Sequence, residues 1–283
     1  MQPSSTVQEV CALVGQPVAG NPTQFMIERA FAKCGLDWRY LSFEVAAEAL
    51  GDAVRGMRAM GFRGGNITTP HKVAVIEFLD RLSPAAELIG AVNCFVREGS
   101  ALVGESTDGK GFLESLHSVI DPAEKHVVLL GAGGAARAIG VELALAKAGK
   151  ITLVNRTPER GEGLVEMLQQ KTGVAAEFVP WQGEYGIPPE AQIVVQATSI
   201  GLNDPRARVP VSFAKVAPKT VVADVVFNPA ETRFLQEAKR AKCVTLDGLG
   251  MIVNQGVIGF QLWTGIEPDR ALMRDAVEEY LSL

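Results

Sequence analysis

Apolar residues recur along this chain in two spacings, and the two spacings alternate. Short apolar runs, typical of buried strands, lie at residues 9–14, 38–45 and 63–68. Apolar positions three or four apart, typical of helices, separate these runs at residues 22–34 and 46–60. Pro70 follows the third run, and a proline at a first helical position predicts that the next helix begins there. This order predicts a largely parallel sheet covered by helices.

The same alternation resumes further along the chain. A short helix at 83–89 and a hairpin at 94–104 come first, and a polar, glycine-rich stretch then opens a helix near Asp108. Further strands are predicted at residues 126–130, 151–155, 175–179, 192–197, 220–226 and 243–246. Helices are predicted at residues 137–148, 229–242, 251–263 and 268–281. The second half therefore also has the pattern of an α/β domain.

A glycine-rich turn joins the strand at 126–130 to the helix that follows it. Its sequence, Gly131-Ala132-Gly133-Gly134-Ala135-Ala136, has the G-x-G-x-x-A form of a dinucleotide-binding turn and lies between a strand and a helix, as that motif requires. Glycines let the backbone approach a pyrophosphate, whose charge then lies at the positive end of the helix dipole. The turn therefore predicts a Rossmann-type nucleotide site.

The next strand ends in a segment that favours NADP over NAD. An NAD enzyme would place Asp or Glu there to hold the ribose hydroxyls, whereas this chain has Asn155-Arg156-Thr157, with Arg160 one turn on. Guanidinium groups suit a ribose 2′-phosphate. Thr198 and Ser199 end a later strand and suit a loop beside the nicotinamide or pyrophosphate, although a plain polar turn explains them equally well. The expected cofactor residues are Gly131, Gly133, Gly134, Ala135, Asn155, Arg156, Thr157, Arg160, Thr198, Ser199, Val225, Gly248 and Met251.

Two α/β domains are therefore expected. Residues 1–106, completed by the C-terminal helices at 251–283, would form a substrate-binding and catalytic domain. Residues 107–250 would form the NADP-binding domain, with the active site in the cleft between the two. The length of 283 residues suits one large or two moderate domains.

The amino-acid composition limits which binding partners are expected. Lys and Arg number 27 and Asp and Glu 32, so the formal charge is −5, and without a basic run we expect neither nucleic-acid nor membrane binding. The four cysteines are scattered and three histidines lie outside ligand spacing, so we expect reduced thiols and no metal. No signal peptide and no apolar run of about 18 residues is evident, which favours a cytoplasmic protein. A monomer or a homodimer is expected.

Polar side chains follow the third strand in the segment Asn66-Ile67-Thr68-Thr69-Pro70-His71-Lys72. Such groups at a strand end commonly face a ligand. Taken alone, Lys72 would be a solvated surface charge and Asp108 the N-terminal cap of its helix. His71 is next to Lys72 in sequence, so its side chain is expected to point elsewhere.

Seven motifs in order resemble the shikimate dehydrogenase family over almost the whole chain. They are the segment 66–72, Ile89-Gly90-Ala91-Val92-Asn93, Thr107-Asp108-Gly109-Lys110-Gly111-Phe112, Gly131-Ala132-Gly133-Gly134-Ala135, Asn155-Arg156-Thr157, Asp247-Gly248 and Gln255-Gly256. The resemblance implies that Lys72 and Asp108 are the catalytic pair. It also implies that Asn93 and Gln255 contact substrate hydroxyls and that the Asn-Arg-Thr segment holds the NADP 2′-phosphate. The expected substrate-binding residues are Asn21, Thr23, Asn66, Thr68, Asn93 and Gln255.

The chain departs from the family where the substrate carboxylate would bind. The family's Ser-x-Ser-Pro segment is replaced by Ala19-Gly20-Asn21-Pro22-Thr23, in which both serines are missing. Phe227 replaces a tyrosine after the Asp224-Val225-Val226 segment, and Ser106 stands where the family usually has Asn. These departures concern substrate recognition, and they indicate a divergent paralogue using shikimate, quinate or aminoshikimate.

The expected reaction is NADP-dependent interconversion of shikimate, or a close analogue, and its 3-dehydro form. Lys72 and Asp108 would share the transfer of the hydroxyl proton, since hydride transfer leaves one proton to be moved. Burial would favour a neutral Lys72, whereas a nearby carboxylate would favour its charged form, and sequence leaves this balance open. An alternative is a non-catalytic NADP or metabolite sensor derived from a dehydrogenase. A glutamyl-tRNA reductase-like enzyme would need a reactive cysteine and a basic surface, and neither is evident.

Overall fold

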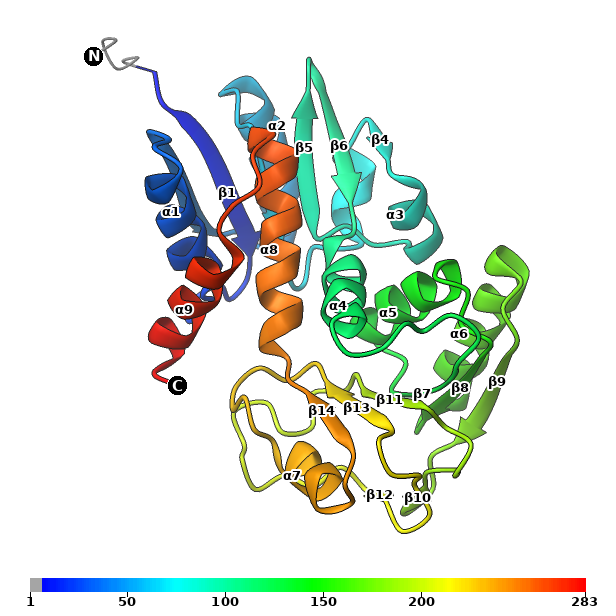
Figure 1. The fold of residues 1–283 in the computed structure, drawn as a ribbon. Coiled ribbons are helices and arrows are strands. Elements are labelled where there is room, and N and C mark those ends of the chain that lie inside the picture. The colour runs from blue at the N-terminus through cyan, green and yellow to red at the C-terminus, as the bar shows by residue number, and fades with distance from the viewer. Residues whose placement is uncertain (1–6) are drawn as a thin grey trace. The chain divides into compact units, whose positions relative to one another are not determined.

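The computed structural model describes residues 7–283, which form two compact units (Figure 1). Of the described residues, the first unit comprises 7–107 together with Gln255–Leu283, and the second comprises Asp108–Asn254. The divisions expected from sequence lay between residues 106 and 107 and between residues 250 and 251. Each unit contains one six-stranded sheet, so the expected α/β class is confirmed.

The sheet of the first unit is mixed, with one strand antiparallel to both of its neighbours and all other neighbouring pairs parallel. Its strand order is β2-β1-β3-β5-β6-β4. The strands are β1 (Glu9–Gly15), β2 (Trp38–Glu44), β3 (Gly64–Ile67), β4 (Arg81–Leu82), β5 (Cys94–Glu98) and β6 (Ala101–Glu105). Because Gly15 pairs with Glu44 and Val14 with Ile67, the carboxyl ends of β1, β2 and β3 meet at one edge. The polar segment that follows β3 starts at this edge.

Helices cover both faces of this sheet, so β1 is buried from Cys11 onward. They are α1 (Thr23–Lys33), α2 (Leu50–Ala59), α3 (Pro84–Ile89), α9 (Arg270–Leu281) and α8 (Leu249–Thr264), which belongs to this unit from Gln255 on. On one face, Val54 and Met57 of α2 join Ala12 and Val14 in a hydrophobic core. On the other face, the rings of Phe31 and Phe260 lie 5.3 Å apart, which joins α1 to α8.

The prediction that a helix begins at Pro70 was wrong. The amide of His71 donates to the carbonyl of Thr68, which closes a turn, and the Thr69–Pro70 peptide bond is cis. The first helical residues are those of the 3₁₀ helix η2 (Ala74–Phe78). The ring of His71 is buried, with Nε2 2.7 Å from the carbonyl oxygen of Val45. This tertiary contact turns the chain inward where local sequence favours a helix. The helix expected at 46–60 is likewise shorter, because η1 (Ala47–Ala49) precedes α2.

The sheet of the second unit is entirely parallel, with strand order β14-β13-β11-β7-β8-β9. Its strands are β7 (His126–Leu130), β8 (Lys150–Asn155), β9 (Ala176–Pro180), β11 (Ile193–Gln196), β13 (Val221–Asp224) and β14 (Val244–Leu246). The chain runs outward from β7 through β8 to β9 and then returns to β11 on the other side of β7. Such a reversal creates a crevice at the carboxyl ends of the two strands, here β7 and β11, where ligands of open α/β sheets bind.

Helices α4 (Thr107–His117), α5 (Gly134–Leu145), α6 (Pro158–Thr172) and α7 (Arg233–Arg240) complete the second unit. Helix α5 begins at Gly134, three residues before the expected start at 137, so the glycine turn leads directly into its first turn. Helix α7 covers one face of the sheet, where its Phe234 and Leu235 pack against Val194 and Val222. A small parallel pair, β10 (Tyr185–Gly186) and β12 (Val211–Ser212), was not expected from sequence.

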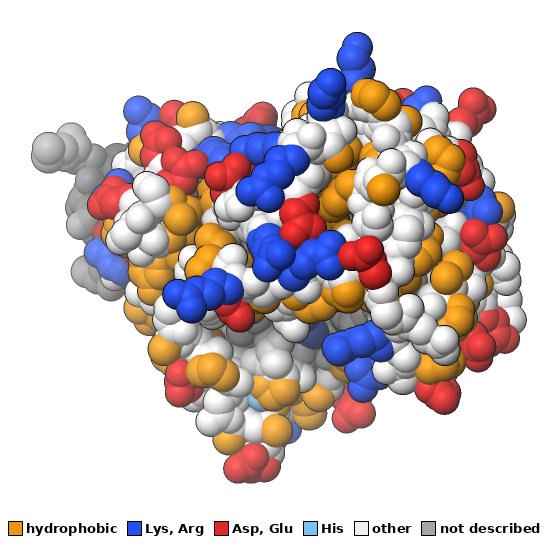
Figure 2. Space-filling view, turned by 90° about the horizontal axis from the view of Figure 1, so that it is seen from below, with side chains coloured by type: hydrophobic (Ala, Val, Ile, Leu, Met, Phe, Trp, Pro, Cys, Tyr) orange, Lys and Arg blue, Asp and Glu red, His pale blue; other side chains and the backbone are white. Residues whose placement is uncertain are grey.

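Charged groups of both signs share the surface. Figure 2 shows Lys and Arg side chains gathered in a short band with Asp and Glu side chains beside them. On the second unit, such mixed pairs include Arg208 with Glu184 and with Glu237. Cys11 and Cys94 are buried, Cys34 and Cys243 are half-buried, and none of these four described cysteines forms a disulfide. Within residues 7–283, none of the helices combines the length and apolarity needed to cross a bilayer.

Candidate functional site

Asn66 lies at the end of β3 in a buried hydrogen-bond network. The Tyr40 hydroxyl donates to its Oδ1 over 2.7 Å, and its Nδ2 donates to the carbonyl of Asn93 over 3.2 Å and to Oε1 of Gln255 over 3.3 Å. Three of the predicted substrate residues are thereby brought together within the first unit. Since both ends of the Asn66 amide have protein partners, this side chain holds its neighbours in place.

Asn93 fixes the start of α4. Its Nδ2 donates to Oγ1 of Thr107 over 2.9 Å, and its Oδ1 accepts from the backbone amide of Thr107 over 2.6 Å. Both Asn93 and Thr107 are buried. Asp108, the predicted catalytic carboxylate, is the next residue and lies in the first turn of α4. The polar residue in the apolar run before β5 thus positions the backbone from which Asp108 projects.

Lys72 lies on the turn after β3 and is half-buried. Its carbonyl accepts from the amide of Val92 over 2.8 Å, so the backbone at Lys72 is tied to the segment that carries Asn93. Thr68 begins the same turn, and its amide donates to the carbonyl of Val14 over 2.9 Å. The side chain of His71 points to Val45, as expected for a structural histidine.

The loop that lacks the family's serines borders a pocket of about 500 Å³ in the first unit. Asn21 accepts from the amide of Thr23 over 2.9 Å, which shapes the entry to α1, and Thr23 itself is buried. Glu44, at the end of β2, accepts from the amide of Val18 over 3.2 Å. The pocket is lined by Val18, Ala19, Gly20, Asn21, Gln24, Phe25, Glu28, Ser42, Glu44 and Tyr280. This lining contains two carboxylates and neither Lys nor Arg.

The glycine turn of the second unit has the shape that a pyrophosphate needs. Gly131 has φ +106°, and a Cβ there would lie 2.9 Å from Cγ2 of Thr198, so only glycine fits. A Cβ at Gly133 or Gly134 would meet nothing within 4 Å, which leaves the backbone at the start of α5 open. No side chain caps α5 at Gly133. Uncapped amides at a helix N-terminus fit a phosphate group.

The other predicted cofactor residues lie at the same edge of this sheet. Asn155 ends β8 and donates to the carbonyl of Thr157 over 2.9 Å, and α6 begins immediately afterwards. Arg156 and Arg160 are exposed there, so their guanidinium groups can reach a 2′-phosphate. A Cβ on Gly248 would lie 2.5 Å from the carbonyl oxygen of Val226, which shows how closely the loops after β14 and β13 approach.

Val225 and Met251 complete the predicted set. The amide of Val225 donates to the carbonyl of Gln196 over 3.0 Å, so Val225 lies where the loop after β13 meets the end of β11. Met251 is in the first turn of α8. Thr198 and Ser199 lie in the turn after β11. This turn lies beside the glycine turn, because a Cβ on Gly131 would be 2.9 Å from Cγ2 of Thr198. The residues of this edge therefore fit a dinucleotide.

Sequence reasoning missed the buried carboxylate of Asp224 as a site residue. It ends β13, is 1% exposed, and accepts hydrogen bonds from three neighbouring groups, on Gln196, Val226 and Thr232. Burial raises the pKa of Asp224 to about 6, and the hydrogen bonds from Thr232 and Val226 oppose this rise. A carboxylate that closes the apolar run Val221–Asp224 was the available signal. Among the described residues, His, Cys, Asp and Glu form no group suited to a metal ion.

Three family models cover most of the chain. Residues 13–95 match the shikimate dehydrogenase substrate binding domain, residues 114–202 match shikimate / quinate 5-dehydrogenase, and residues 248–278 match the shikimate 5′-dehydrogenase C-terminal domain. A shikimate dehydrogenase (NADP(+)) of Moorella thermoacetica is 43% identical over 272 residues, which are 95% of this chain and 92% of that protein.

Solved structures agree with this assignment. The ligand-free 5-ketofructose reductase of Gluconobacter sp. strain CHM43 is 48% identical, with a TM-score of 0.95, and the match covers 97% of this chain and 99% of that one. Shikimate 5-dehydrogenase of Thermus thermophilus, solved with NADP(H) and shikimate, is 35% identical with a TM-score of 0.85 and coverage of 96% and 100%. The chain belongs to the shikimate dehydrogenase family, as its seven motifs indicated.

Proposed function

We propose that this protein is an NADP-dependent oxidoreductase that interconverts an uncharged polyhydroxy ketone, such as 5-ketofructose, and its secondary alcohol. The choice of this substrate class rests on one observation. The loop at Ala19 to Thr23, where the family's serines would hold a carboxylate, borders a pocket whose lining includes Glu28 and Glu44. Among the described residues, this lining contains no Lys or Arg, and the Arg29 guanidinium lies over the ring of Phe25. A similar protein of 48% identity is a 5-ketofructose reductase, which supports this substrate class.

The pocket's chemistry favours hydroxyl groups over an anion. Carboxylates accept hydrogen bonds from hydroxyls and repel a substrate carboxylate, and this repulsion is modest at an exposed group such as Glu44. The rings of Phe25 and Tyr280, 5.7 Å apart, add apolar surface to the lining for the C–H groups of a sugar, and one face of the Phe25 ring is covered by the Arg29 guanidinium. Ser42, Asn21 and Gln24 add side chains that both donate and accept.

Shikimate is the second candidate substrate, and the relatives favour it. Curated shikimate dehydrogenases match 95–97% of this chain at 36–43% identity. The Asn66–Asn93–Gln255 network is also present, and it matches the family residues that contact substrate hydroxyls. Hydroxyl contacts serve a sugar as well as a cyclic acid, so this network does not decide between the two substrates.

Lys72 and Asp108 are proposed as the catalytic pair. Bound NADPH supplies a hydride to the carbonyl carbon, and the carbonyl oxygen must then gain one proton. We assign this proton to Lys72 Nζ, with Asp108 holding the ammonium and the substrate oxygen in line. The hydrogen bonds from Val92 to Lys72 and between Asn93 and Thr107 fix the backbone at both groups. In the oxidative direction the same pair takes the hydroxyl proton.

The cofactor is proposed to lie along the carboxyl edge of the second unit's sheet. The amides at Gly133 and Gly134 would hold the pyrophosphate, and Arg156 and Arg160 would pair with the 2′-phosphate. Thr198, Ser199 and Val225 would border the nicotinamide. The open backbone at the start of α5 and the exposed guanidinium groups after β8 support this placement.

The test is a substrate panel with a charge-matched variant. NADPH oxidation is followed with 5-ketofructose, 3-dehydroshikimate and 3-dehydroquinate, and kcat/KM is obtained for each. We expect the neutral ketone to be preferred. Glu44→Gln keeps an acceptor for Val18 while removing the charge, so it should raise kcat/KM for the acids about two- to fivefold. Glu48→Gln, an exposed carboxylate outside the pocket lining, is the control. Preference for an acid would overturn the proposal, and NADPH binding without turnover would favour the sensor.

A further inference from the structure

We infer that Asp224 is a positioning residue for the cofactor site. Its buried carboxylate fixes Gln196 and the first turn of α7, and it thereby keeps the loop at Thr198–Ser199 in the shape that the cofactor needs. The inference rests on the proposed cofactor site. Asp224 ends β13, and its two oxygens face three donors. Oδ1 accepts from Gln196 Nε2 over 3.1 Å and from the Val226 amide over 2.9 Å, and Oδ2 accepts from the Thr232 hydroxyl over 2.7 Å.

The carboxylate determines which way the Gln196 amide points. An ionised carboxylate only accepts, so Gln196 must turn its NH₂ group toward Asp224. Its oxygen then faces the other way, where Oε1 accepts from the amide of Thr198 over 2.5 Å. Nε2 also donates to the carbonyl of Ile200 over 3.0 Å. A single buried amide thus holds both ends of the 198–200 turn, and Asp224 sets its orientation.

This turn lies against the glycine turn. Thr198 Oγ1 accepts from the amide of Ile200 over 3.1 Å, which closes the turn further. The methyl group of Thr198 occupies the space that a Cβ on Gly131 would need. A different orientation of Gln196 would therefore move Thr198 relative to the turn proposed to hold the pyrophosphate.

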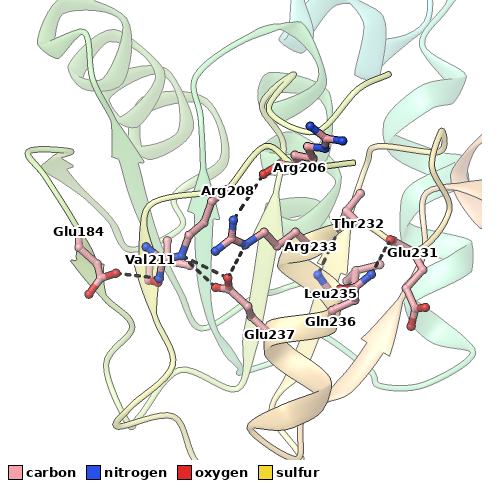
Figure 3. Close-up of polar contacts among 10 residues, drawn as sticks. All are labelled: Glu184, Arg206, Arg208, Val211, Glu231, Thr232, Arg233, Leu235, Gln236 and Glu237. Atoms are coloured by element: carbon pink, nitrogen blue, oxygen red, sulfur yellow. Dashed lines mark hydrogen bonds and ion pairs between the residues drawn. The ribbon is translucent and has the colours of Figure 1, made fainter. Parts of the chain in front are cut away.

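Thr232 connects the carboxylate to α7. Its hydroxyl donates to Asp224 and accepts from the amide of Leu235 over 3.3 Å, so it is the N-cap of the helix. On the outer side of α7, Arg233 and Arg208 both pair with Glu237, at 3.0 and 3.2 Å (Figure 3). The first turn of α7 is thereby held from inside by Asp224 and from outside by these pairs.

The test measures the loop without cofactor and then cofactor binding. Thr232→Val removes the donor to Oδ2 and the cap, whereas Thr232→Ser keeps the hydroxyl. Asp224→Asn keeps the shape but presents a group that can either donate or accept to Gln196. Amide exchange of residues 197–202 is measured in the cofactor-free protein, and the Kd for NADPH is measured by fluorescence. Glu231→Gln removes an exposed carboxylate beside Thr232 together with its surface ion pair to Lys239, and it is the matched control because exposed pairs contribute little.

We expect Asp224→Asn and Thr232→Val to speed exchange in the 197–202 turn and to raise the Kd for NADPH about tenfold, the effect of losing one or two buried hydrogen bonds. Thr232→Ser and Glu231→Gln should match the wild-type protein. Unchanged exchange and unchanged Kd in Asp224→Asn would overturn the inference. If the wild-type protein binds no NADPH, the proposed function fails, whereas the exchange result still decides whether Asp224 orders the turn.

Discussion

The hydroxyl of Tyr40 donates to Oδ1 of Asn66 over 2.7 Å, and this bond is shielded from water because Tyr40 is 0% exposed and Asn66 5%. Burial raises the pKa of Tyr40 well above its usual range, so the phenol remains a neutral donor. The bond turns the Asn66 oxygen toward Tyr40 and therefore its NH₂ group toward Asn93 and Gln255. One tyrosine of β2 thus orients an amide that joins three segments of the first unit.

Tyr40→Phe should lower the free energy of unfolding by about 1–3 kcal/mol, because Asn66 Oδ1 would remain buried without its donor. The released amide could also turn, so KM for substrate should rise more than kcat falls. Chemical denaturation and steady-state kinetics measure the two effects. Tyr185→Phe, in the second unit, is the matched control. Wild-type stability and KM in Tyr40→Phe would contradict the role given to this hydroxyl.

Lys72→Ala should reduce kcat at least about a hundredfold, because a positioned proton-transfer group contributes that much. The Kd for NADPH should stay at the wild-type value, since the proposed cofactor residues lie in the second unit. Lys110→Ala, a lysine of α4, controls for the loss of a positive charge. Near-full turnover of Lys72→Ala would remove Lys72 from the mechanism, and an equal loss in both variants would point to a general charge effect.

Arg156→Ala combined with Arg160→Ala should weaken NADPH binding about tenfold or more, because charge-assisted hydrogen bonds to a phosphate contribute roughly 1.5–3 kcal/mol. Binding of NADH should change little, since NADH has no 2′-phosphate. Titration of both cofactors into the double variant measures the difference. Lys171→Ala, in the last turn of the same helix α6, is the control. Equal weakening for NADPH and NADH would show that the arginines do not read the 2′-phosphate.

Asp224 should make stability depend on pH in a direction opposite to that of an ordinary paired carboxylate. Burial raises its pKa from 3.8 to about 6, so the folded state holds this proton more tightly than the unfolded chain does. The resulting stabilisation is present below about pH 4 and is lost as the pH rises through about 6. The Asp224→Asn variant has no titrating carboxyl group at this position, so it lacks this contribution to the pH dependence of stability.

The difference in Tm between the wild-type protein and Asp224→Asn should therefore depend on pH. As the pH rises from about 4 to about 6, the wild-type protein should lose stability relative to the variant. Thermal unfolding of both proteins in the same buffers cancels the titration of all other groups. Parallel Tm curves would mean that the pKa of Asp224 is not raised by burial.

Much of the fold follows from local patterns in the sequence. The apolar runs predicted every strand of the second sheet, and the pattern is clearest in β11 and β13, because strands buried on both faces have few polar positions. The glycine turn was also recognisable from the sequence, since φ +106° at Gly131 is a backbone requirement that glycine meets best. Asn155-Arg156-Thr157 lies at the end of a strand, as the apolar pattern predicted, and its role with the 2′-phosphate stays a prediction.

Contacts between distant segments were not predictable in this way. Asn66 and Gln255 are 189 positions apart, and nothing local indicates that their amides meet. Pro70 favours a helix start by itself, yet the burial of His71 against Val45 decides the turn. Asp224 looks like the plain end of a strand until Gln196 and Thr232 are placed around it. In each case the deciding partner comes from another part of the chain.

An internal competition tests most directly whether the altered loop after β1 selects a neutral polyhydroxy ketone. Equal concentrations of 5-ketofructose and 3-dehydroshikimate are incubated with the protein and limiting NADPH, and the two alcohols are quantified. The product ratio gives the ratio of kcat/KM values whatever fraction of the protein is active. At least about ten times more alcohol from the keto sugar is expected, a difference of roughly 1.4 kcal/mol. Shikimate as the main product would contradict the claim.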